Sequence, residues 1–196
     1  MMMGGWNMSS YDQQPKILVF AGPNGSGKST VTKGSKIVGE YINADKIKSI
    51  KGCSDLEAAQ EAEHLRERLL SLGMDFTFET VLSTPRNLLL LQRAHTAGYY
   101  IRVFFVLTND CSINVRRVAD RVSKGGHDVP EDKIRSRYTK SLSNLKELYR
   151  IVDDLWLYDN SGDAPVLIGT VHDSRLTYYD NPNWSQDAVM DLFQQK

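Results

Sequence analysis

The sequence predicts an α/β fold with a mainly parallel central sheet. Residues 17–20 (Ile-Leu-Val-Phe) are a short run of bulky apolar side chains, which is typical of a buried parallel strand. Strand-like patterns at 76–81 and 99–108 alternate with segments whose apolar residues recur at helical spacing. Such alternation predicts a three-layer arrangement, in which helices cover both faces of the sheet.

The first half of the chain supplies three of the predicted strands. After the strand at 17–20, a helix is expected from about residue 28, and a second short strand should end near residues 43–45. Ser54 and Glu57 have the spacing of a capping box and predict the start of a longer helix. A strand at 76–81 and a helix at 85–97 follow. The helix after the capping box should bury residues at three- and four-residue spacing: Leu56, Ala59, Ala62, Leu65, Leu69 and Leu72.

The second half continues the alternation. A strand at 99–108 precedes a helix at about 112–123, which "KGGHDVP" (124–130) interrupts, and Pro130 is suited to open the next helix. Two late strands are expected at 154–160 and 164–171, and at most one short helix at 181–196. The buried face of the helix after Pro130 should consist of Ile134, Tyr138, Leu142, Leu145 and Leu148.

Composition narrows the class of protein. The 196 residues suit one domain over 16–196, preceded by a tail at 1–15 whose composition predicts disorder. The 24 basic and 24 acidic residues balance, so nucleic acid is not an expected partner. A bilayer span needs about 20 apolar residues in succession, which the chain lacks, and its two cysteines offer no disulfide framework. These features predict a cytoplasmic protein that does not bind membranes.

A glycine-rich segment follows the first strand and predicts a nucleotide site. "GPNGSGKS" (22–29) fits the phosphate-binding pattern G-x-x-x-x-G-K-[S/T]. Its backbone amides and the following helix would cradle phosphates, Lys28 would reach the β- and γ-phosphates of ATP, and the hydroxyl of Ser29 would ligate Mg²⁺. The alternative, a flexible glycine linker, fits poorly with the preceding strand. The predicted phosphate-binding residues are Gly22, Pro23, Asn24, Gly25, Ser26, Gly27, Lys28, Ser29 and Thr30.

Two carboxylates are expected close to this segment. Ligands of parallel sheets gather beyond the carboxyl ends of the strands, which places Asp45 and Glu79 beside the phosphate site. Asp45 is a candidate catalytic base or, alternatively, the N-cap of the next helix. Glu79 is a candidate substrate ligand or an ordinary residue at a strand end. The adjacent Thr80 could donate a hydrogen bond to the same substrate, or it could be structural.

A basic segment with a Gly-Gly break predicts a lid over about 115–140. Arginines that close over the transferred phosphate stabilise its charge, and two of the four here are expected to do so, with Arg121 first. The others would pair with nearby acidic residues on a solvated face. His127, beside the break, is a candidate phosphate donor, and the turn at 159–162 could contact adenine or simply reverse the chain. The four arginines are Arg117, Arg121, Arg135 and Arg137.

These segments together resemble the zeta-toxin family of P-loop kinases, especially its short members. The likeness rests on "GPNGSGKST", "INADKI", "FTFET" and "RVSKGGHDVPEDKIRSRYTKSLSNL", and it extends over about residues 16–170. It implies phosphorylation of the 3-hydroxyl of the amino sugar in UDP-N-acetylglucosamine, and it implies a protein antitoxin as partner. By the same resemblance Asp45 is the general base, Glu79 binds substrate, and lid arginines that contact phosphate lie near Arg117 and Arg121. His127 stands where the family has a second arginine.

Other functions stay open on the sequence alone. The chain could phosphorylate a different hydroxyl, for example on a nucleoside or at the end of a polynucleotide. It could also be a nucleotide switch that works through protein partners, although neither a guanine-specific Asn-Lys-x-Asp motif nor a Leu-Ser-Gly-Gly signature is present.

Overall fold

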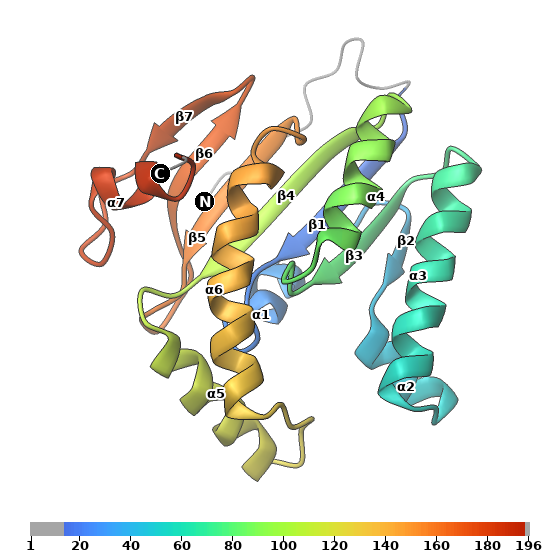
Figure 1. Ribbon diagram of the computed structural model, residues 1–196, viewed down its shortest axis with the longest axis horizontal. Helices are drawn as coiled ribbons and strands as arrows, with labels where there is room; N and C mark the ends of the chain where they lie inside the picture. The colour runs from blue at the N-terminus through green and yellow to red at the C-terminus, as the bar shows by residue number, and fades with distance from the viewer. Residues whose placement is uncertain (1–13, 195–196) are drawn as a thin grey trace.

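The computed structural model describes residues 14–194, so the predicted tail at 1–15 lies almost entirely outside the described residues. Strands and helices alternate through most of this range (Figure 1). The strands are β1 (Lys16–Ala21), β2 (Glu40–Ile42), β3 (Phe76–Thr80), β4 (Tyr100–Leu107), β5 (Asp154–Asp159), β6 (Val166–His172) and β7 (Arg175–Tyr178). The helices are α1 (Lys28–Lys33), α2 (Ala44–Lys51), α3 (Asp55–Ser71), α4 (Pro85–Thr96), α5 (Cys111–Ser123), α6 (Glu131–Leu148) and α7 (Gln186–Asp191).

The strands form one mixed sheet in the order β2-β3-β1-β4-β5-β6-β7. Neighbouring strands from β2 to β5 run parallel, whereas β6 is antiparallel to both β5 and β7. The mainly parallel sheet is therefore confirmed, but β7 was not expected. Its hairpin turns through Asp173 (φ 48°) and Ser174 (φ 60°), so the glycine or asparagine that signals such a turn is missing.

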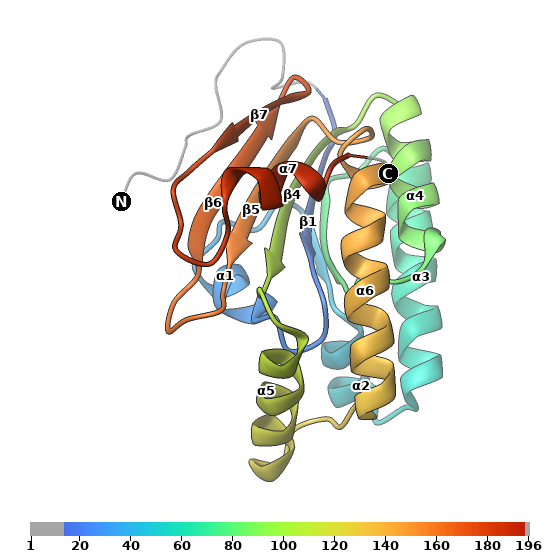
Figure 2. The ribbon, with the colours of Figure 1, turned by 60° about the vertical axis from the view of Figure 1, so that its left-hand side comes forward.

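Helices lie on both faces of the sheet, with most of them on one side. Figure 2 shows α3, α4 and α6 on one face and α1 on the other. The main core fills the space under the larger helical layer, where Val19, Val103 and Phe105 are fully buried. On the opposite face the rings of Phe20 and Phe104 pack at a centroid distance of 5.4 Å. This is the expected three-layer fold, with unequal outer layers.

The helix α3 begins where its capping box predicts, but its buried face differs from the prediction. The Ser54 hydroxyl accepts a hydrogen bond from the backbone of Glu57, whose carboxylate accepts one from the backbone of Ser54. Leu56 and Leu72, at the two ends, are 67% and 58% exposed. Ala59 is also exposed, and the buried side chains are Ala58, Ala62 and Leu69. The side chains at both ends of the helix therefore face solvent, and the apolar spacing there does not mark a core face.

The segment after β2 also corrects a prediction. The strand ends at Ile42, and Asn43 caps α2 by accepting a hydrogen bond from the backbone of Lys46 at 3.1 Å. Asp45 lies in the first turn of this helix and is not its N-cap, so that alternative is wrong. Asn43 takes the role because its extended backbone and short amide side chain suit the capping position.

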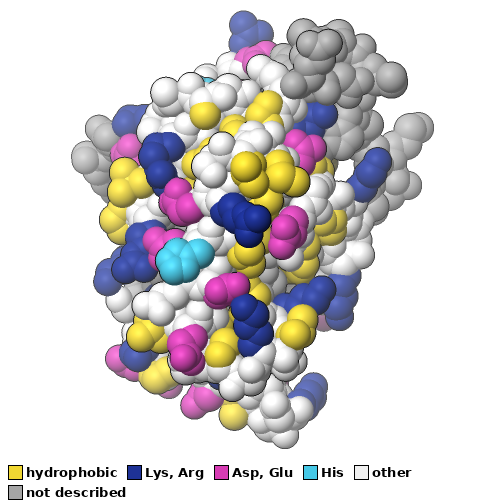
Figure 3. All heavy atoms as spheres, turned by 90° about the vertical axis from the view of Figure 1, so that its right-hand side faces the viewer, with side chains coloured by type: hydrophobic (Ala, Val, Ile, Leu, Met, Phe, Trp, Pro, Cys, Tyr) yellow, Lys and Arg dark blue, Asp and Glu magenta, His cyan; other side chains and the backbone are white. Residues whose placement is uncertain are grey.

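The surface over α3 carries charges of both signs. Figure 3 faces this side, where Lys and Arg side chains alternate with Asp and Glu. Two ion pairs join α4 to α3, from Arg86 to Glu63 and from Arg93 to Glu67. This face therefore offers no uniformly basic surface to a nucleic acid. Within residues 14–194, none of the helices combines the length and apolar character needed to cross a bilayer.

Candidate active site

The segment between β1 and α1 forms a tight loop at the carboxyl ends of the parallel strands. Gly22, Gly25 and Gly27 have φ values of 139°, 74° and 91°, in the range that favours glycine. A β-carbon at Gly22 would lie 2.1 Å from the carbonyl oxygen of Val106, and one at Gly25 would lie 2.5 Å from that of Asn114. The glycines therefore allow the loop to pack closely against β4 and α5, in a backbone conformation that other residues rarely adopt.

Two buried asparagines hold the loop from outside its motif. Asn114 on α5 donates a hydrogen bond to the carbonyl oxygen of Asn24 at 2.7 Å, and Asn160 after β5 donates to that of Ser26 at 2.8 Å. The backbone amide of Asn160 in turn donates to Leu107 at the end of β4. The shape of the loop thus depends on residues that lie 90 and 134 positions away in the chain.

Lys28 starts α1 and turns back over the loop. Its amino group donates to the carbonyl oxygens of Gly22 and Pro23 at 2.7 and 2.9 Å. Burial lowers the pKa of Lys28 to about 8, although the nearby carboxylates of Glu79 and Asp45 act in the opposite direction. These two carboxylates are therefore close enough to Lys28 to influence its charge.

A large cleft of about 1050 Å³ opens beside the loop. The ends of β1, β2 and β3 meet there, as the parallel topology predicts. Asp45 and Glu79 both line the cleft together with Tyr41 and Asn43. The opposite side comes from α5, the segment after it and the start of α6. The phosphate-loop residues that line the cleft are Asn24, Gly25, Gly27, Lys28 and Ser29, whereas Gly22, Pro23 and Ser26 are buried and Thr30 is exposed outside it.

Glu79 is held firmly at the end of β3. Its Oε1 accepts hydrogen bonds from the hydroxyl of Tyr41 at 2.5 Å and from that of Thr32 at 3.1 Å. The adjacent Thr80 lines the cleft but is buried, and its hydroxyl oxygen accepts from the backbone of Leu82 and the side chain of Asn87. Thr80 thus shapes the segment after β3, where Leu82 has a φ of 54°.

The four arginines of the basic segment differ in their surroundings. Arg117 donates to the carbonyl oxygens of Asn160 and Gly162, which ties α5 to the turn after β5. Arg121 donates to the carbonyl oxygen of His127. Arg135 is paired with Glu131 on the surface, as the alternative interpretation expects. Arg137 lies 3.4 Å from the side-chain oxygen of Asn24. Arg117, Arg121 and Arg137 line the cleft, and Arg135 does not.

The Gly-Gly break ends α5 and brings His127 to the cleft. Gly125 has a φ of 81°, and the backbone amide of Gly126 donates to the carbonyl oxygen of Arg121 at 2.9 Å. Beyond them, a small separate core of Val118, Val129 and Ile134 joins the two helices. The His127 ring lies 3.8 Å from the carboxylate of Asp55 at the start of α3. The segment therefore spans the cleft from α5 to α3.

The zeta toxin family matches residues 38–170 of this sequence, more than half of the chain. The chain belongs to the zeta toxin family. Its fold, with a phosphate loop after β1, is that of a P-loop kinase. A protein of unknown function from Haemophilus influenzae is 29% identical over 131 residues, which covers 64% of this chain and 94% of that protein.

Solved structures share the fold at low sequence identity. AvrRxo1-ORF1, in a complex with AvrRxo1-ORF2 and ATP, superposes with a TM-score of 0.70 at 14% identity over 92% of this chain. This zeta-toxin chain spans 64% of the length of that protein. The PezAT toxin–antitoxin system of Streptococcus pneumoniae gives a TM-score of 0.58 at 18% identity, over 93% of this chain and 78% of that one.

Several cleft residues were not identified from the sequence. Tyr41 and Thr32 contact Glu79, and Lys33 and Lys133 line the cleft. Tyr41 stands two residues before the Asn-x-Asp segment, and side chains two apart on a strand share a face. That spacing puts Tyr41 on the same side of the chain as Asn43 but does not indicate its contact with Glu79, and nothing local distinguishes the two lysines from surface residues.

Proposed function

We propose that this zeta-toxin chain is an ATP-dependent kinase that phosphorylates a hydroxyl of a UDP-activated amino sugar, with the 3-hydroxyl of UDP-N-acetylglucosamine as the leading acceptor. The observation that carries the proposal is the placement of Lys28, Asp45 and Glu79 in one cleft at the ends of three neighbouring strands. A phosphate site and two carboxylates are the groups that a hydroxyl-directed phosphotransferase needs.

The nucleotide half of the cleft suits ATP. The loop fixed by Gly22, Gly25 and Gly27 would direct backbone amides towards bound phosphates, and Lys28 would leave its carbonyl partners to contact them. The structural likeness to AvrRxo1-ORF1, which was solved with ATP, supports the same ligand. Lys28 then neutralises charge on the β- and γ-phosphates during transfer.

The residues at the loop also fit Mg²⁺. Kinases hold this ion through one or two protein oxygens plus phosphates and water, so a dedicated protein cage is not needed. Ser29 lines the cleft beside Lys28, and the described residues contain no cluster of three or more acidic, histidine or cysteine ligands. Bound there, Mg²⁺ would neutralise phosphate charge and help orient the terminal phosphate.

In the acceptor half, two carboxylates would lie beside the terminal phosphate of bound ATP. Asp45 would accept the proton of the acceptor hydroxyl while that oxygen bonds to the γ-phosphorus and the bond to the β–γ bridging oxygen breaks, which releases ADP. Glu79 would hold a second polar group of the acceptor. Arg121 and Arg117, at the opposite wall, would stabilise the charge that spreads over the transferred phosphoryl oxygens.

The size and charge of the cleft favour an acceptor that carries phosphates of its own. Its volume of about 1050 Å³ is at the upper end of the roughly 300–1,000 Å³ of small-molecule pockets. Lys33, Lys133 and Arg137 add positive charge beyond Lys28. A nucleotide sugar uses these cations better than a neutral sugar does, because its diphosphate can pair with them. His127 is a further donor on this side.

A protein antitoxin is the partner that we infer for the chain. The PezAT proteins are described as a toxin–antitoxin system, and AvrRxo1-ORF1 was solved as a complex with AvrRxo1-ORF2. A partner that occupies the mouth of the cleft would exclude ATP. The same proposal places the protein in the cytoplasm, where ATP and nucleotide sugars are available.

The proposal is tested by incubating the protein with Mg²⁺-ATP and a panel of UDP-sugars and nucleosides, with mass spectrometry of the products. We expect one added phosphate on UDP-N-acetylglucosamine, and we expect Asp45→Asn to abolish transfer while ATP affinity is kept. A matched variant, Asp187→Asn on α7, should behave as wild type. If phosphate appears on a nucleoside alone, the nucleoside replaces UDP-N-acetylglucosamine as the proposed acceptor. Full activity of Asp45→Asn would exclude Asp45 as the general base.

A further inference from the structure

The hydroxyls of Tyr41 and Thr32 both contact the same carboxylate oxygen of Glu79. Tyr41 comes from β2 and its hydroxyl donates to Oε1 at 2.5 Å, and the hydroxyl of Thr32, from α1, lies 3.1 Å from the same oxygen. Among the described residues the hydrogen bonds to this carboxylate all fall on Oε1, and the side chain lines the cleft. Oε2 is therefore the oxygen that can accept a hydrogen bond from a bound substrate.

The direction of the hydrogen bond from Tyr41 is fixed by its other partner. The side-chain oxygen of Asn43 accepts from the backbone of Lys46, so the amide nitrogen of Asn43 points to Tyr41 and donates to its hydroxyl oxygen at 3.2 Å. The single proton of Tyr41 is then directed to Glu79. Burial, followed by the hydrogen bond to Glu79, raises the pKa of Tyr41 well above its usual value, so the proton stays in place at physiological pH.

These contacts form one chain of hydrogen bonds across three elements. It runs from the backbone of Lys46 in α2 through Asn43 and Tyr41 to Glu79 at the end of β3. Thr32 adds α1, because its hydroxyl lies within hydrogen-bond distance of both Lys28 O and Glu79 Oε1. Asp45 lies in the first turn of the helix that Asn43 caps. The network therefore holds the two carboxylates in a fixed relation to each other and to the phosphate loop.

We propose that Tyr41 is a positioning residue for the acceptor: it holds Glu79 so that Oε2 binds a second hydroxyl or N–H of the acceptor while Asp45 faces the reacting hydroxyl. This inference rests on the proposed kinase function. It also defines the acceptor class. The molecule must carry a hydrogen-bond donor close to the hydroxyl that receives the phosphate, as a sugar or an amino sugar does and a simple alcohol does not.

Kinetics with UDP-N-acetylglucosamine and Mg²⁺-ATP test the proposal. Tyr41→Phe keeps the ring and removes the hydroxyl, and it should raise KM for the acceptor roughly tenfold, with KM for ATP unchanged. Thr32→Val should raise the acceptor KM severalfold. Thr32→Ser, which keeps the hydroxyl, should have the acceptor KM of the wild-type protein. Tyr149→Phe is the matched control, since that hydroxyl donates to the carbonyl oxygen of Ser174 outside the cleft.

A double-mutant cycle separates positioning from simple packing. If Tyr41 acts through Glu79, then adding Tyr41→Phe to Glu79→Gln should cause little further loss, whereas a packing role gives losses that multiply. Thermal unfolding of each variant monitors folding, and the Thr32 pair supplies the test if Tyr41→Phe does not fold.

The outcomes also separate this inference from the kinase proposal. An unchanged acceptor KM in Tyr41→Phe, or multiplying losses with Glu79→Gln, overturns the role of Tyr41 and leaves the kinase proposal intact. Absence of transfer to any member of the acceptor panel by the wild-type protein overturns the kinase proposal, and the role of Tyr41 with it.

Discussion

The side-chain amide of Asn160 donates a hydrogen bond to the carbonyl oxygen of Ser26 at 2.8 Å, so the last parallel strand holds the phosphate loop in place. Asn160→Ala should weaken ATP binding roughly tenfold, because the loss of a buried hydrogen bond costs about 1–3 kcal/mol and leaves the loop carbonyl unpaired. Isothermal titration calorimetry with ATP measures the change.

A second asparagine provides the comparison for this prediction. The amide of Asn144 donates to the carbonyl oxygen of Leu82 at 2.9 Å, and neither residue belongs to the phosphate loop. Asn144→Ala should lower the melting temperature about as much as Asn160→Ala does, but it should leave the affinity for ATP unchanged. Equal losses of ATP affinity in both variants would show that Asn160 acts only through general stability.

Gly27 is a loop position where substitution should be damaging. Its φ is 91°, and a β-carbon there would lie 2.0 Å from the side-chain nitrogen of Asn160. Gly27→Ala should abolish measurable ATP binding while the circular dichroism spectrum stays native. Gly34→Ala is the control, because the nearest atom would lie 3.8 Å from its β-carbon. ATP binding by Gly27→Ala at wild-type affinity would mean that the loop relaxes without loss of function.

The lowered pKa of Lys28 predicts proton uptake when ATP binds. With a pKa of about 8 the amine is mostly neutral at pH 8.5, and bound phosphates would raise the pKa and restore the charge. We expect more protons to be taken up per ATP at pH 8.5 than at pH 7. Titration calorimetry in buffers of different ionisation enthalpy measures the uptake at each pH. Uptake that is no greater at pH 8.5 than at pH 7 would contradict the prediction.

Sequence reasoning works well where the signal is local or topological. The phosphate loop is a contiguous motif. Asp45 follows β2 and Glu79 is the last residue but one of β3, and the carboxyl ends of these strands must meet in a parallel sheet, so their common cleft could be expected. The hydrogen-bond partners that hold these residues could not be predicted from the sequence. Tyr41 contacts Glu79 because β2 pairs with β3 in one particular register, and Asn160 reaches Ser26 across 134 positions. Such contacts depend on packing that the sequence pattern does not encode.

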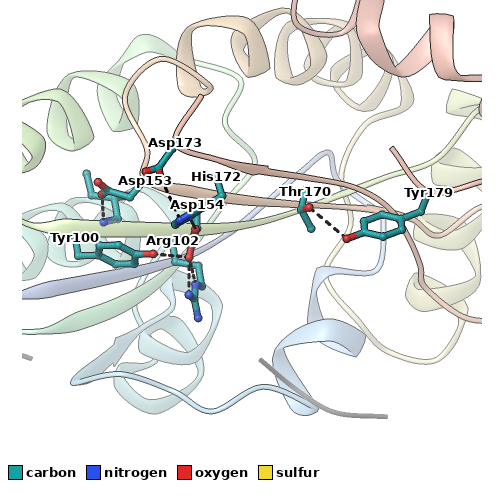
Figure 4. Close-up of polar contacts among 9 residues, drawn as sticks. Tyr100, Arg102, Asp153, Asp154, Thr170, His172, Asp173 and Tyr179 are labelled. Carbon is teal, nitrogen blue, oxygen red and sulfur yellow. Dashed lines mark hydrogen bonds and ion pairs between the residues drawn. The ribbon is translucent and has the colours of Figure 1, made fainter. Parts of the chain in front are cut away.

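A second polar cluster lies where β4 and β5 begin, at the opposite end of these strands from the cleft. Figure 4 shows its side chains. The carboxylate of Asp154, at the start of β5, is only 7% exposed. It accepts hydrogen bonds from Tyr100 at 2.5 Å, from the Nε of Arg102 at 2.7 Å, and from the Nδ1 of His172 at 2.7 Å. Burial alone would raise the pKa of Asp154, but these three partners outweigh it and the pKa is lowered.

This cluster predicts how stability depends on pH. The hydrogen bond to Asp154 raises the pKa of His172 above 6.5, and the charges of Asp154 and Asp173 act in the same direction. The folded state therefore holds a proton that the unfolded state releases, so this contribution to stability is complete below pH 6.5 and is lost as pH rises through the raised pKa. His172→Asn should consequently lower the melting temperature more at pH 5.5 than at pH 8.5. A pH-independent effect of His172→Asn would mean that the ring contributes through packing alone.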